Sequence, residues 1–347
     1  MIAPAVGSGT GAARPREATT MAGQEGGPLV LGIDLGGTKV VAGVVDAEHR
    51  ILGRAKRPTP AREGAAAILQ ALVDVAGAAL AEARTRPEDL AGVGVGSPGP
   101  LDAEAGVILF SPNMNVRDFA LGPDLARALG RPVLVQNDVR VAGYGEFRLG
   151  AGRGFQDILA AFVGTGIGGC IIQQGRILTG TTGNAGEIGH VIVKAGGPPC
   201  GCGGRGCLEA LASRTAITRR MQKAVRKGVA TGLGRQLSSK SSQLKSKDLA
   251  AAVRSGDPLA VKEVGRAARF LGLALGGLVN LLAPQIVIIG GGVTEALGNP
   301  WVDQVAAVAR NQAMADPKGK VQIERAALGD DAGLLGAALM ARERFAG

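Results

Sequence analysis

A chain of 347 residues with 46% hydrophobic residues is long enough for two domains and for a sizeable core. The formal net charge of +10 is concentrated in residues 214–247, which hold ten Lys or Arg and no Asp or Glu, so the remainder has 29 basic against 29 acidic residues. With one Trp and one Tyr for base stacking, the composition excludes a protein-wide nucleic-acid-binding face. The basic segment is then either a solvated helix and loop or an attractant for anionic nucleotide or polyphosphate.

The N-terminal residues 1–27 are rich in Gly, Ala, Pro, Thr and Arg without periodicity, and we expect a disordered tail with Met21 as an alternative start. They show no basic-then-apolar signal region. Residues 271–289 are long and apolar enough to suggest a membrane span, but Pro284 and two polar residues interrupt them, which favours a buried helix ending near Ala283 and then a core strand. Three of the four cysteines fall within eight residues, as is typical of metal or redox chemistry in a reducing cell. We therefore expect a cytoplasmic protein with no membrane partner.

The first part of the chain has the pattern of a mixed α/β domain. Short apolar runs separated by turn residues predict an antiparallel meander, and the periodicity that follows predicts helices and further buried strands. The expected strands are residues 29–34, 40–45, 50–55, 91–96 and 132–136, and the expected helices are residues 65–83 and 138–148.

The second part repeats this plan. LVLGIDLGGTKVVAGVVDAEHRIL, from residue 29, and ILAAFVGTGIGGCIIQQGRIL, from residue 158, both run strand, glycine turn, strand, turn, strand. The repeat predicts two similar α/β domains with a ligand site in the cleft between them. The expected strands are residues 158–163, 170–173, 285–289 and 321–324, the expected helices lie near residues 208–227, 257–282, 301–314 and 331–345, and residues 229–247 are expected to form a mobile loop. The expected domains are residues 28–136 and 137–347, with the last helix, 331–347, packing back on the first domain.

Matching positions of the two repeats carry glycine-rich loops. Residues 34–39 are Asp-Leu-Gly-Gly-Thr-Lys, and residues 164–169 are Gly-Thr-Gly-Ile-Gly-Gly. Without Cβ atoms, such a backbone can approach phosphate oxygens and its N–H groups can form an anion nest, although Gly-Gly also forms ordinary hairpin turns. Two opposed loops favour phosphate binding, and neither fits a Walker or Rossmann pattern. Asp34 is a candidate Mg²⁺ ligand through water, and Thr38 adds a hydroxyl.

A third glycine turn, residues 290–292, follows an apolar run and indicates either a close backbone approach to adenosine or a plain strand-to-helix turn. The candidate nucleotide-binding residues are therefore Asp34, Gly36, Gly37, Thr38, Lys39, Gly164, Thr165, Gly166, Gly168, Gly290, Gly291 and Gly292. The segment 328–333, ahead of the last helix, is expected only to cap that helix.

Between the two loops, Gln136-Asn137-Asp138 stands where a buried strand gives way to a helix. A carboxylate there is well placed to accept the proton of an attacking hydroxyl during phosphoryl transfer. The alternative is that Asn137 or Asp138 only caps the helix.

Four potential metal ligands lie close together in the sequence. His190 ends the motif Glu187-Ile-Gly-His, and Cys200, Cys202 and Cys207 follow it. One His and three Cys suit a closed, tetrahedral, structural Zn²⁺ site with no open position for catalysis. The alternative is a set of buried thiols without metal. A metal-binding knuckle over residues 190–207 would shape the loop that carries Glu187 and Glu209.

Together these motifs resemble the ROK family (repressors, open reading frames and sugar kinases). The glycine loops, Gly-Ser-Pro-Gly at 96–99, Asn137-Asp138, Glu-Ile-Gly-His at 187–190, the cysteine knuckle and the turn at 290–292 occur in family order over residues 29–345. The resemblance implies an actin-like ATPase (ribonuclease H-like) fold whose two domains close over sugar and Mg·ATP. It also implies phosphorylation of the 6-hydroxyl of glucose and a homodimer or higher homo-oligomer.

The resemblance further implies that Asp138 is the general base and that five residues hold the sugar hydroxyls, with one ring nitrogen of His190 on zinc and the other toward the sugar. These five are Asn113, Asn137, Glu187, His190 and Glu209. Two features depart from the family pattern. Cys170 replaces a frequent Gly or Ala after the second loop, and residues 111–119 lack the tryptophan that many glucokinases have nearby.

Other activities share these motifs. Kinases for N-acetylmannosamine, N-acetylglucosamine, fructose or allose have nearly all of them, and a polyphosphate-dependent glucokinase has support only in residues 214–247. A non-enzymatic ROK repressor would carry a helix-turn-helix domain, whereas only about 27 residues precede the first expected strand. The intact Asp138 also favours catalysis.

Overall fold

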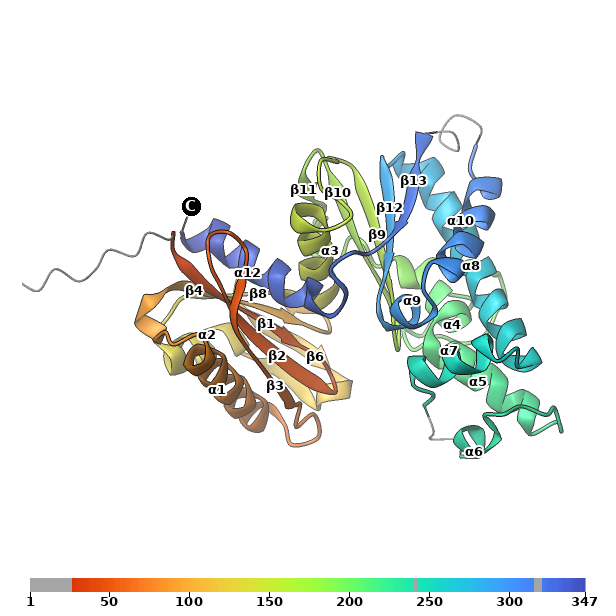
Figure 1. Cartoon of the computed structure of the whole chain (residues 1–347), viewed down its shortest axis with the longest axis horizontal. Coiled ribbons are helices and arrows are strands. Elements are labelled where there is room, and N and C mark those ends of the chain that lie inside the picture. The colour runs from red at the N-terminus through yellow and green to blue at the C-terminus, as the bar shows by residue number, and fades with distance from the viewer. Residues whose placement is uncertain (1–26, 240–242, 315–319, 347) are drawn as a thin grey trace, which may run out of the picture.

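The computed structural model describes residues 27–239, 243–314 and 320–346, and it shows two α/β lobes, each built on a five-stranded sheet (Figure 1). The predicted tail at residues 1–26, with Met21, lies outside these ranges. The strand orders are β3-β2-β1-β4-β8 and β11-β10-β9-β12-β13. In each sheet two parallel strands extend an antiparallel meander of three. This shared plan confirms the repeat that the sequence predicts.

The first sheet is covered by a helix on each face. Alternate side chains of its first strand, such as Leu31 and Ile33, face helix α1, while Val30 on the opposite face contacts helix α12. The sheet consists of β1 (Leu29–Leu35), β2 (Lys39–Val45), β3 (Ile51–Pro58), β4 (Leu90–Ser97) and β8 (Val133–Asn137), and the two helices are α1 (Ala65–Glu82) and α12 (Ala332–Phe345). All of these elements were predicted to within a few residues.

Two apolar segments bear on a membrane-spanning interpretation. Helix α1 is, within the described ranges, the one helix that is long and apolar enough to cross a membrane. Of its 18 residues, 33% are buried. Its inward side chains, such as Leu72 and Val75, lie in the core of the first lobe, and a core helix of a globular domain passes the same test. Residues 271–289 divide into helix α8 (Pro258–Leu282) and strand β12 (Ile286–Gly290), as predicted from Pro284.

A small third sheet and one helix of the first lobe were not predicted. The strands are β5 (Leu101–Asp102), β6 (Val107–Ser111) and β7 (Val116–Phe119), followed by helix α2 (Leu121–Leu129). The strands are too short for a periodic signal, and β6 exposes Leu109 (43%) and Phe110 (41%), which breaks the usual alternation of apolar and polar residues. Helix α2 was missed although its nine residues form one apolar face.

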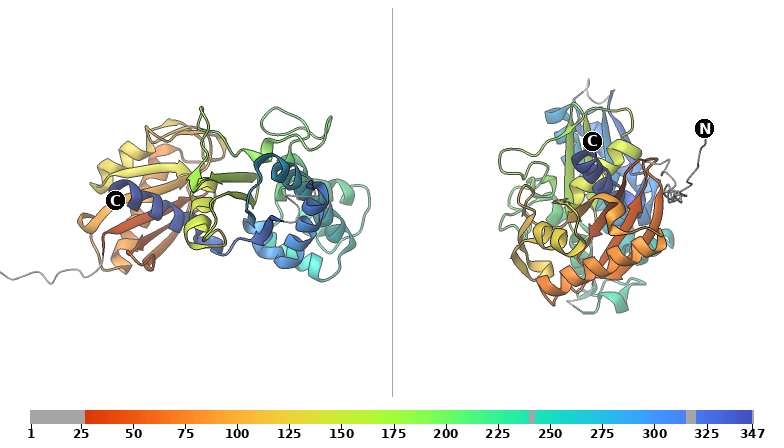
Figure 2. Two further views of the ribbon diagram at one scale, coloured as in Figure 1. Left: turned by 90° about the horizontal axis from the view of Figure 1, so that it is seen from above. Right: turned by 90° about the vertical axis from the view of Figure 1, so that its left-hand side faces the viewer.

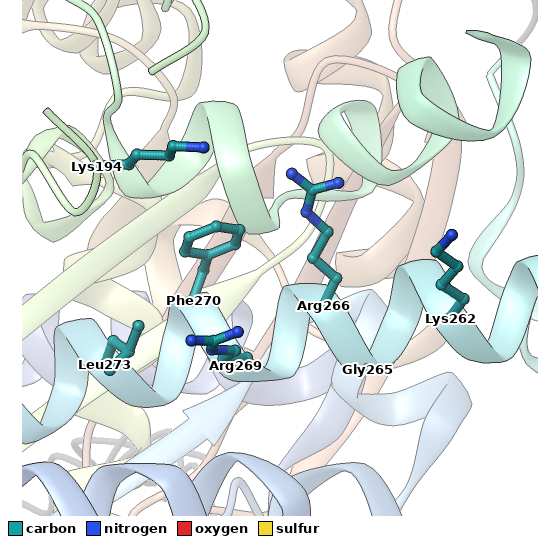
Figure 3. A pocket seen from close by; sticks show the side chains of 7 residues that line it. All are labelled: Lys194, Lys262, Gly265, Arg266, Arg269, Phe270 and Leu273. Carbon is teal, nitrogen blue, oxygen red and sulfur yellow. The ribbon is translucent and has the colours of Figure 1, made fainter. Parts of the chain in front are cut away.

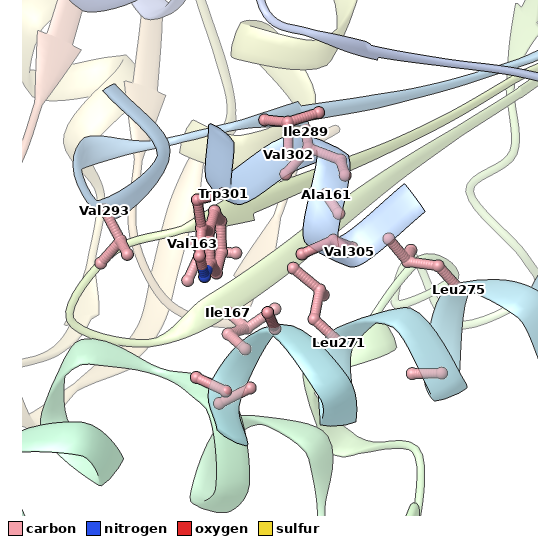
Figure 4. Packing of buried hydrophobic residues seen from close by; sticks show 14 of the residues in the cluster. Ala161, Val163, Ile167, Leu271, Leu275, Ile289, Val293, Trp301, Val302 and Val305 are labelled. Carbon is pink, nitrogen blue, oxygen red and sulfur yellow. The ribbon is translucent and has the colours of Figure 1, made fainter. Parts of the chain in front are cut away.

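The second lobe packs its sheet against a layer of helices, and Figure 4 shows Val163, Leu271 and Trp301 meeting in that core. Its strands are β9 (Ile158–Val163), β10 (Ile167–Gln173), β11 (Arg176–Ile177), β12 and β13 (Gln322–Arg325), and its helices are α4 (Leu208–Ala212), α5 (Arg214–Val225), α6 (Gly234–Leu237), α7 (Ser246–Arg254), α8, α9 (Gly292–Leu297) and α10 (Asn299–Gln312). The prediction of a mobile loop over residues 229–247 is wrong in part, because α6 and the start of α7 lie there; residues 240–242 fall outside the described ranges.

The chain passes between the lobes twice, once through helix α3 (Asp138–Leu149) and once through the segment that leads into α12 (Figure 2). Helix α12 approaches the first sheet so closely that a Cβ at Gly32 or Gly94 would stand 2.1 or 1.9 Å from a backbone oxygen of the helix. Helices α3 and α12 meet equally closely at Gly145 and Gly336. Glycine at these positions therefore allows the two connecting elements to pack backbone against backbone.

A buried carboxylate joins the two passages. Glu146 of α3 is 0% exposed, and it accepts hydrogen bonds from the backbone N–H groups of Ala151 (2.9 Å), Ala327 (3.0 Å) and Leu328 (2.8 Å). The last two residues belong to the segment that leads into α12. Charge-assisted bonds to three otherwise unpaired donors stabilise this arrangement strongly.

The tight contact between α3 and α12 can be tested with Gly336→Ala. The added Cβ would stand 1.7 Å from the carbonyl oxygen of Val141. Because this clash is with backbone, no change of side-chain rotamer can relieve it, and we expect the free energy of unfolding to fall by about 3 kcal/mol. The matched control is Gly77→Ala in α1, where a Cβ meets nothing within 4 Å and helix propensity predicts a gain of about 0.5–1 kcal/mol. Urea denaturation measures both, and a neutral Gly336→Ala variant would contradict the packing argument.

Candidate active site

Asp138, the predicted general base, lies where β8 gives way to α3. The parallel register pairs Asp34 with Gly96 and Gly96 with Gln136, so the carboxyl ends of β1, β4 and β8 meet at one edge of the first sheet. This edge carries both Asp34 and Asp138. A Cβ at Gly96 would stand 2.4 Å from the Val141 side chain, so glycine is needed there to admit the first turn of α3.

Asn137 is the N-cap of α3. Its Oδ1 accepts from the backbone N–H groups of Val139 (3.1 Å) and Arg140 (3.2 Å), which confirms the capping interpretation for this residue. Its side-chain NH₂ has no partner within the described part of the chain. Asp138 uses one carboxylate oxygen to accept from the Val139 N–H at 2.9 Å, and no side chain of the described residues donates to this carboxylate.

The surroundings of Asp138 favour its protonated form. Burial, the negative charge of Asp34 and, to a smaller extent, that of Glu187 raise the pKa of Asp138 to about 6. Burial also raises the pKa of Asp34, against the opposing charge of Lys39. Three predicted site residues thus share one electrostatic environment, and a carboxyl group with a pKa near 6 is suited to exchanging a proton near neutral pH.

The first glycine loop is a tight hairpin between β1 and β2. The Gly36 N–H donates to the Lys39 carbonyl at 3.0 Å, as in an ordinary hairpin turn. Gly37 and Thr38, however, are exposed, and a Cβ at Gly37 would meet nothing within 4 Å. The outer side of the turn is therefore open to a ligand.

The segment 328–333 forms ion pairs in place of the helix cap that the sequence predicts. Asp331 is the N-cap residue of α12 but makes no capping hydrogen bond, so the capping prediction is wrong. Its carboxylate instead pairs with Arg54 at 3.0 Å, and that of Asp330 pairs with Lys39 at 2.9 Å. Ion pairs to strand β3 and to the first glycine loop compete with the cap.

Asp34 faces the N-terminal turn of α12. A Cβ at Gly333 would stand 2.9 Å from the Asp34 carboxyl carbon, so only glycine leaves room for this carboxylate. Asp34 accepts no side-chain hydrogen bond from the described residues, and the positive charge of Lys39 opposes the effect of burial on its pKa. Such a partly buried carboxylate fits the chemistry of a Mg²⁺ ligand, directly or through water.

The second glycine loop is held between two helices of the site. A Cβ at Gly166 would stand 2.3 Å from the Glu209 carboxylate, and one at Gly168 would stand 2.5 Å from the Val139 side chain. Glu209 Oε2 also accepts from the Ile167 N–H at 3.0 Å. The structure thus places Glu209 beside this loop, with one oxygen engaged by the loop's backbone.

The turn at residues 290–292 lies beside the second loop. Gly291 has φ +86°, and a Cβ there would stand 2.6 Å from the Val163 nitrogen, so its close approach is to the end of β9. Gly164 has open space around it and Thr165 is exposed. Gly290 is buried against Phe162, whereas Gly164, Thr165, Gly291 and Gly292 are at least partly exposed. Contact of these residues with adenosine remains a prediction.

The loop with Glu187 and His190 rests directly on β10. A Cβ at Gly189 would stand 2.0 Å from the Ile167 carbonyl oxygen, which explains glycine between the two polar residues. Both side chains are exposed. Asn113 is exposed in the 3₁₀ turn η2 (Pro112–Met114) and makes no hydrogen bond to the described residues.

Arg140, which sequence reasoning missed, ties α3 to the loop that leads to Glu187. Its buried guanidinium donates to the carbonyl oxygens of Gly183 and, at 2.9 Å, Ala185. Partners more than 40 residues away leave no local sequence signal for this role. Arg140 therefore positions Glu187 relative to Asp138.

The predicted metal ligands are gathered in space. The ligand atoms of His190, Cys200, Cys202 and Cys207 all lie within 4.8 Å of one another. Cys202 Sγ is 3.7 Å from Cys207 Sγ, and Cys200 Sγ is 3.7 Å from His190 Nδ1. A tetrahedral ion with Zn–S distances of about 2.3 Å requires Sγ–Sγ separations of about 3.8 Å, so the four residues fit Zn²⁺. Coordination through Nδ1 would leave Nε2 of His190 facing outward.

Two surface hollows lie away from these residues. One, of about 640 Å³, is bounded by Lys194 and by Lys262, Arg266 and Arg269 on the outer face of α8 (Figure 3). The other, of about 210 Å³, lies against residues 103–106. Neither is lined by a predicted site residue, so neither alters the location of the site.

Comparison with known proteins identifies the family. The sequence profile of the ROK family matches residues 30–344. This chain belongs to the ROK family. Its similarity to the glucokinase of Thermotoga maritima is 36% identity over 322 residues, 92% of this chain and 98% of that protein.

Solved ROK structures show the same fold, which is the actin-like ATPase fold that the resemblance implies. A ROK family glucokinase from Streptomyces griseus, in complex with glucose and AMPPNP, is 36% identical with a TM-score of 0.79, over 91% of this chain and 99% of that one. A ROK hexokinase from Thermus thermophilus is 38% identical with a TM-score of 0.75, over 91% and 98%. The ROK xylose repressor of Caldicellulosiruptor bescii is less similar, at 27% identity over 79% of this chain and 68% of that protein.

Proposed function

We propose that this protein is an ATP-dependent sugar kinase that transfers the γ-phosphate of ATP to the 6-hydroxyl of glucose. The observation that carries the proposal is Asp138, a carboxylate with a raised pKa, at the edge between two open glycine loops. The similarity of the whole chain to glucokinases, at 36% identity, supports glucose as the acceptor.

The donor would lie along the two glycine loops and the turn at residues 290–292. The loops offer backbone N–H groups to the phosphates, and Lys39 adds a positive charge beside the first loop. Mg²⁺, held by Asp34, would neutralise phosphate charge when bound. Because the two loops come from different lobes, both are in place only when the lobes approach each other.

The acceptor sugar would be held by Asn113, Asn137, Glu187, His190 and Glu209. Asn137 has a free NH₂ group to donate, Glu187 is an exposed acceptor, and the Nε2–H of His190 would donate when Nδ1 is held by zinc. Glu187 and His190 lie on a loop fixed by Gly189 and Arg140. The unprotonated Asp138 accepts the hydroxyl proton as the phosphoryl group is transferred. Positioning by these residues, more than covalent chemistry, provides the rate enhancement.

Zn²⁺ in the cluster of His190 and three cysteines would have a structural role. Cys207 is the N-cap residue of α4, which carries Glu209, and His190 ends the loop with Glu187. The ion would thus fix two sugar-binding segments relative to each other. We further propose a cytoplasmic location, where thiols stay reduced, and a homodimer or higher homo-oligomer.

The proposal is tested by measuring ATP-dependent phosphorylation of glucose, mannose, fructose, N-acetylglucosamine and N-acetylmannosamine with Mg²⁺ present. We expect kcat/KM for glucose to exceed that for the acetylated sugars by at least about tenfold, since a site whose polar groups hydrogen-bond the sugar hydroxyls discriminates against substituted ones. A preference for an acetylated sugar would show that the acceptor is an N-acetylhexosamine and not glucose. If the protein binds a sugar but phosphorylates none of the five, the proposed kinase activity is wrong and a sugar-sensing function is favoured.

A further inference from the structure

The first residue of helix α5, Arg214, is fastened to the second glycine loop. Its backbone N–H donates to the Gly164 carbonyl at 3.0 Å. The hydroxyl of the next residue, Thr215, donates to the Thr165 carbonyl at 2.8 Å. The position of the Arg214 side chain is therefore set by the backbone of the loop that the proposed function assigns to phosphate binding.

The guanidinium of Arg214 has hydroxyl partners but no acidic one. Its two terminal nitrogens donate to Thr165 Oγ1 at 2.6 Å and to Ser246 Oγ at 3.2 Å, and its Nε is buried without a partner in the described part of the chain. No carboxylate of the described residues forms an ion pair with it. Burial, with no acid to offset it, lowers the pKa of Arg214. A partly buried cation in this state is destabilising until an anion approaches it.

The same guanidinium lies between two segments of the proposed donor site. Ser246, its second partner, has its hydroxyl 3.6 Å from the place where a Cβ on Gly292 would stand. Thr165, its first partner, is the exposed residue of the second glycine loop. Arg214 thus spans from the phosphate loop to the turn at residues 290–292.

We propose that Arg214 binds the phosphate groups of the nucleotide donor, as a specificity-determining residue for phosphorylated adenosine over adenosine itself. This inference rests on the proposed function, since it assigns a residue to the donor site. The terminal nitrogens of arginine carry four N–H groups, of which two are engaged by hydroxyls, and the planar fork suits two phosphate oxygens at once. Lys39 on the opposite loop is paired with Asp330 at 2.9 Å, whereas Arg214 has no acidic partner among the described residues.

The test compares Arg214→Met with a matched control, Arg219→Met, an exposed arginine of the same helix. Isothermal titration calorimetry with Mg²⁺ measures the Kd of ADP, AMP, adenosine and glucose for each variant. For Arg214→Met we expect the Kd of ADP to rise about 10–100-fold, that of AMP to rise less, and those of adenosine and glucose to stay within about twofold. Arg219→Met should match the wild type throughout.

Three results would overturn the inference. An unchanged Kd for ADP would show that no phosphate contacts Arg214. An equal loss for adenosine would place the contact on the base or ribose. A lower melting temperature of the free protein together with weaker glucose binding would show that Arg214 only holds α5 against the second glycine loop and has no role in binding phosphate. Arg214→Lys, which keeps the charge and loses the fork, should recover part of the ADP affinity but not all of it.

The proposed function and the assignment of Arg214 can be tested independently. ADP binding is measured without turnover, so a wild-type protein that binds ADP but phosphorylates no sugar overturns the proposed activity and still tests Arg214. A wild-type protein that binds no adenine nucleotide overturns both. Sugar phosphorylation by the wild type with unchanged ADP binding by Arg214→Met overturns only the assignment of Arg214.

Discussion

Replacing Asp138 with asparagine is expected to lower kcat by about 10³-fold while the Kd of glucose changes by less than about threefold. Asparagine has the same shape and can still accept from the Val139 N–H, but its amide cannot take the proton of the 6-hydroxyl. Removal of a general base typically costs about 10²–10⁴-fold in rate. Steady-state kinetics and glucose titration provide the two numbers. Asp124→Asn, on the exposed side of α2, is the matched control and should keep full activity.

The same variant carries a stability signature. The pKa of Asp138 is raised from 3.8 to about 6, so its ionised form is disfavoured by folding, and above pH 6 the native state is destabilised by on the order of 3 kcal/mol. Asp138→Asn should therefore melt at a higher temperature than the wild type at pH 7.5, and this gain should vanish below pH 4. An inactive variant that is also less stable would mean that the substitution damages the fold.

The pH profile of the wild type follows from the same carboxyl group. The base must be ionised to accept a proton, so the rate should fall as the pH drops below about 6, tenfold per pH unit. A flat profile between pH 5 and 8 would contradict the assignment of Asp138 as the base.

Cys207→Ser is expected to remove the bound metal and to disable sugar binding. We expect wild-type protein to contain about one zinc per chain and the variant almost none, since loss of one of four ligands opens the tetrahedral site. The Kd of glucose should rise about 100-fold, because the segments with His190 and Glu209 lose their common anchor. Elemental analysis and calorimetry measure the two effects, and a lower melting temperature should accompany them.

Cys170→Ala is the control for this experiment. Cys170 is buried against Gly143 of α3, outside the metal cluster, and burial raises the pKa of its thiol to about 12, so it is an unreactive core residue. The variant should keep one zinc and most of its glucose affinity. A metal-free wild-type protein with full activity would refute the zinc site.

The larger elements of the fold could be predicted because their signals are local. The two meanders have short apolar runs and glycine turns, and their similarity in sequence is matched by the same strand order in both sheets. The strands β5–β7 were not predicted because they are two to five residues long and partly exposed. Helix α7 was not predicted because it begins within a Ser- and Lys-rich run whose composition is typical of a loop.

The candidate site could be predicted only where a residue has chemistry of its own. Asp138 and the metal ligands carry such signals, and the structure brings Asp138 near Asp34 and gathers the four ligands. Residues that act through distant partners gave no signal. Arg140 and Glu146 bind backbone groups more than 40 and 180 residues away, and Arg214 was counted only as part of a basic segment. The failed cap at Asp331 has the same cause, since Arg54 is remote in sequence.

The three hydrogen bonds of Glu146 have a mechanical consequence. The chain crosses between the lobes twice, and two independent linkers would let the lobes twist and slide as well as close. Because Glu146 on the first crossing holds the backbone of the second, we expect both crossings to act as one hinge with a single axis. Asp138 lies two turns of helix before Glu146, close to that axis, so we expect the base to stay nearly fixed while the second glycine loop swings toward it.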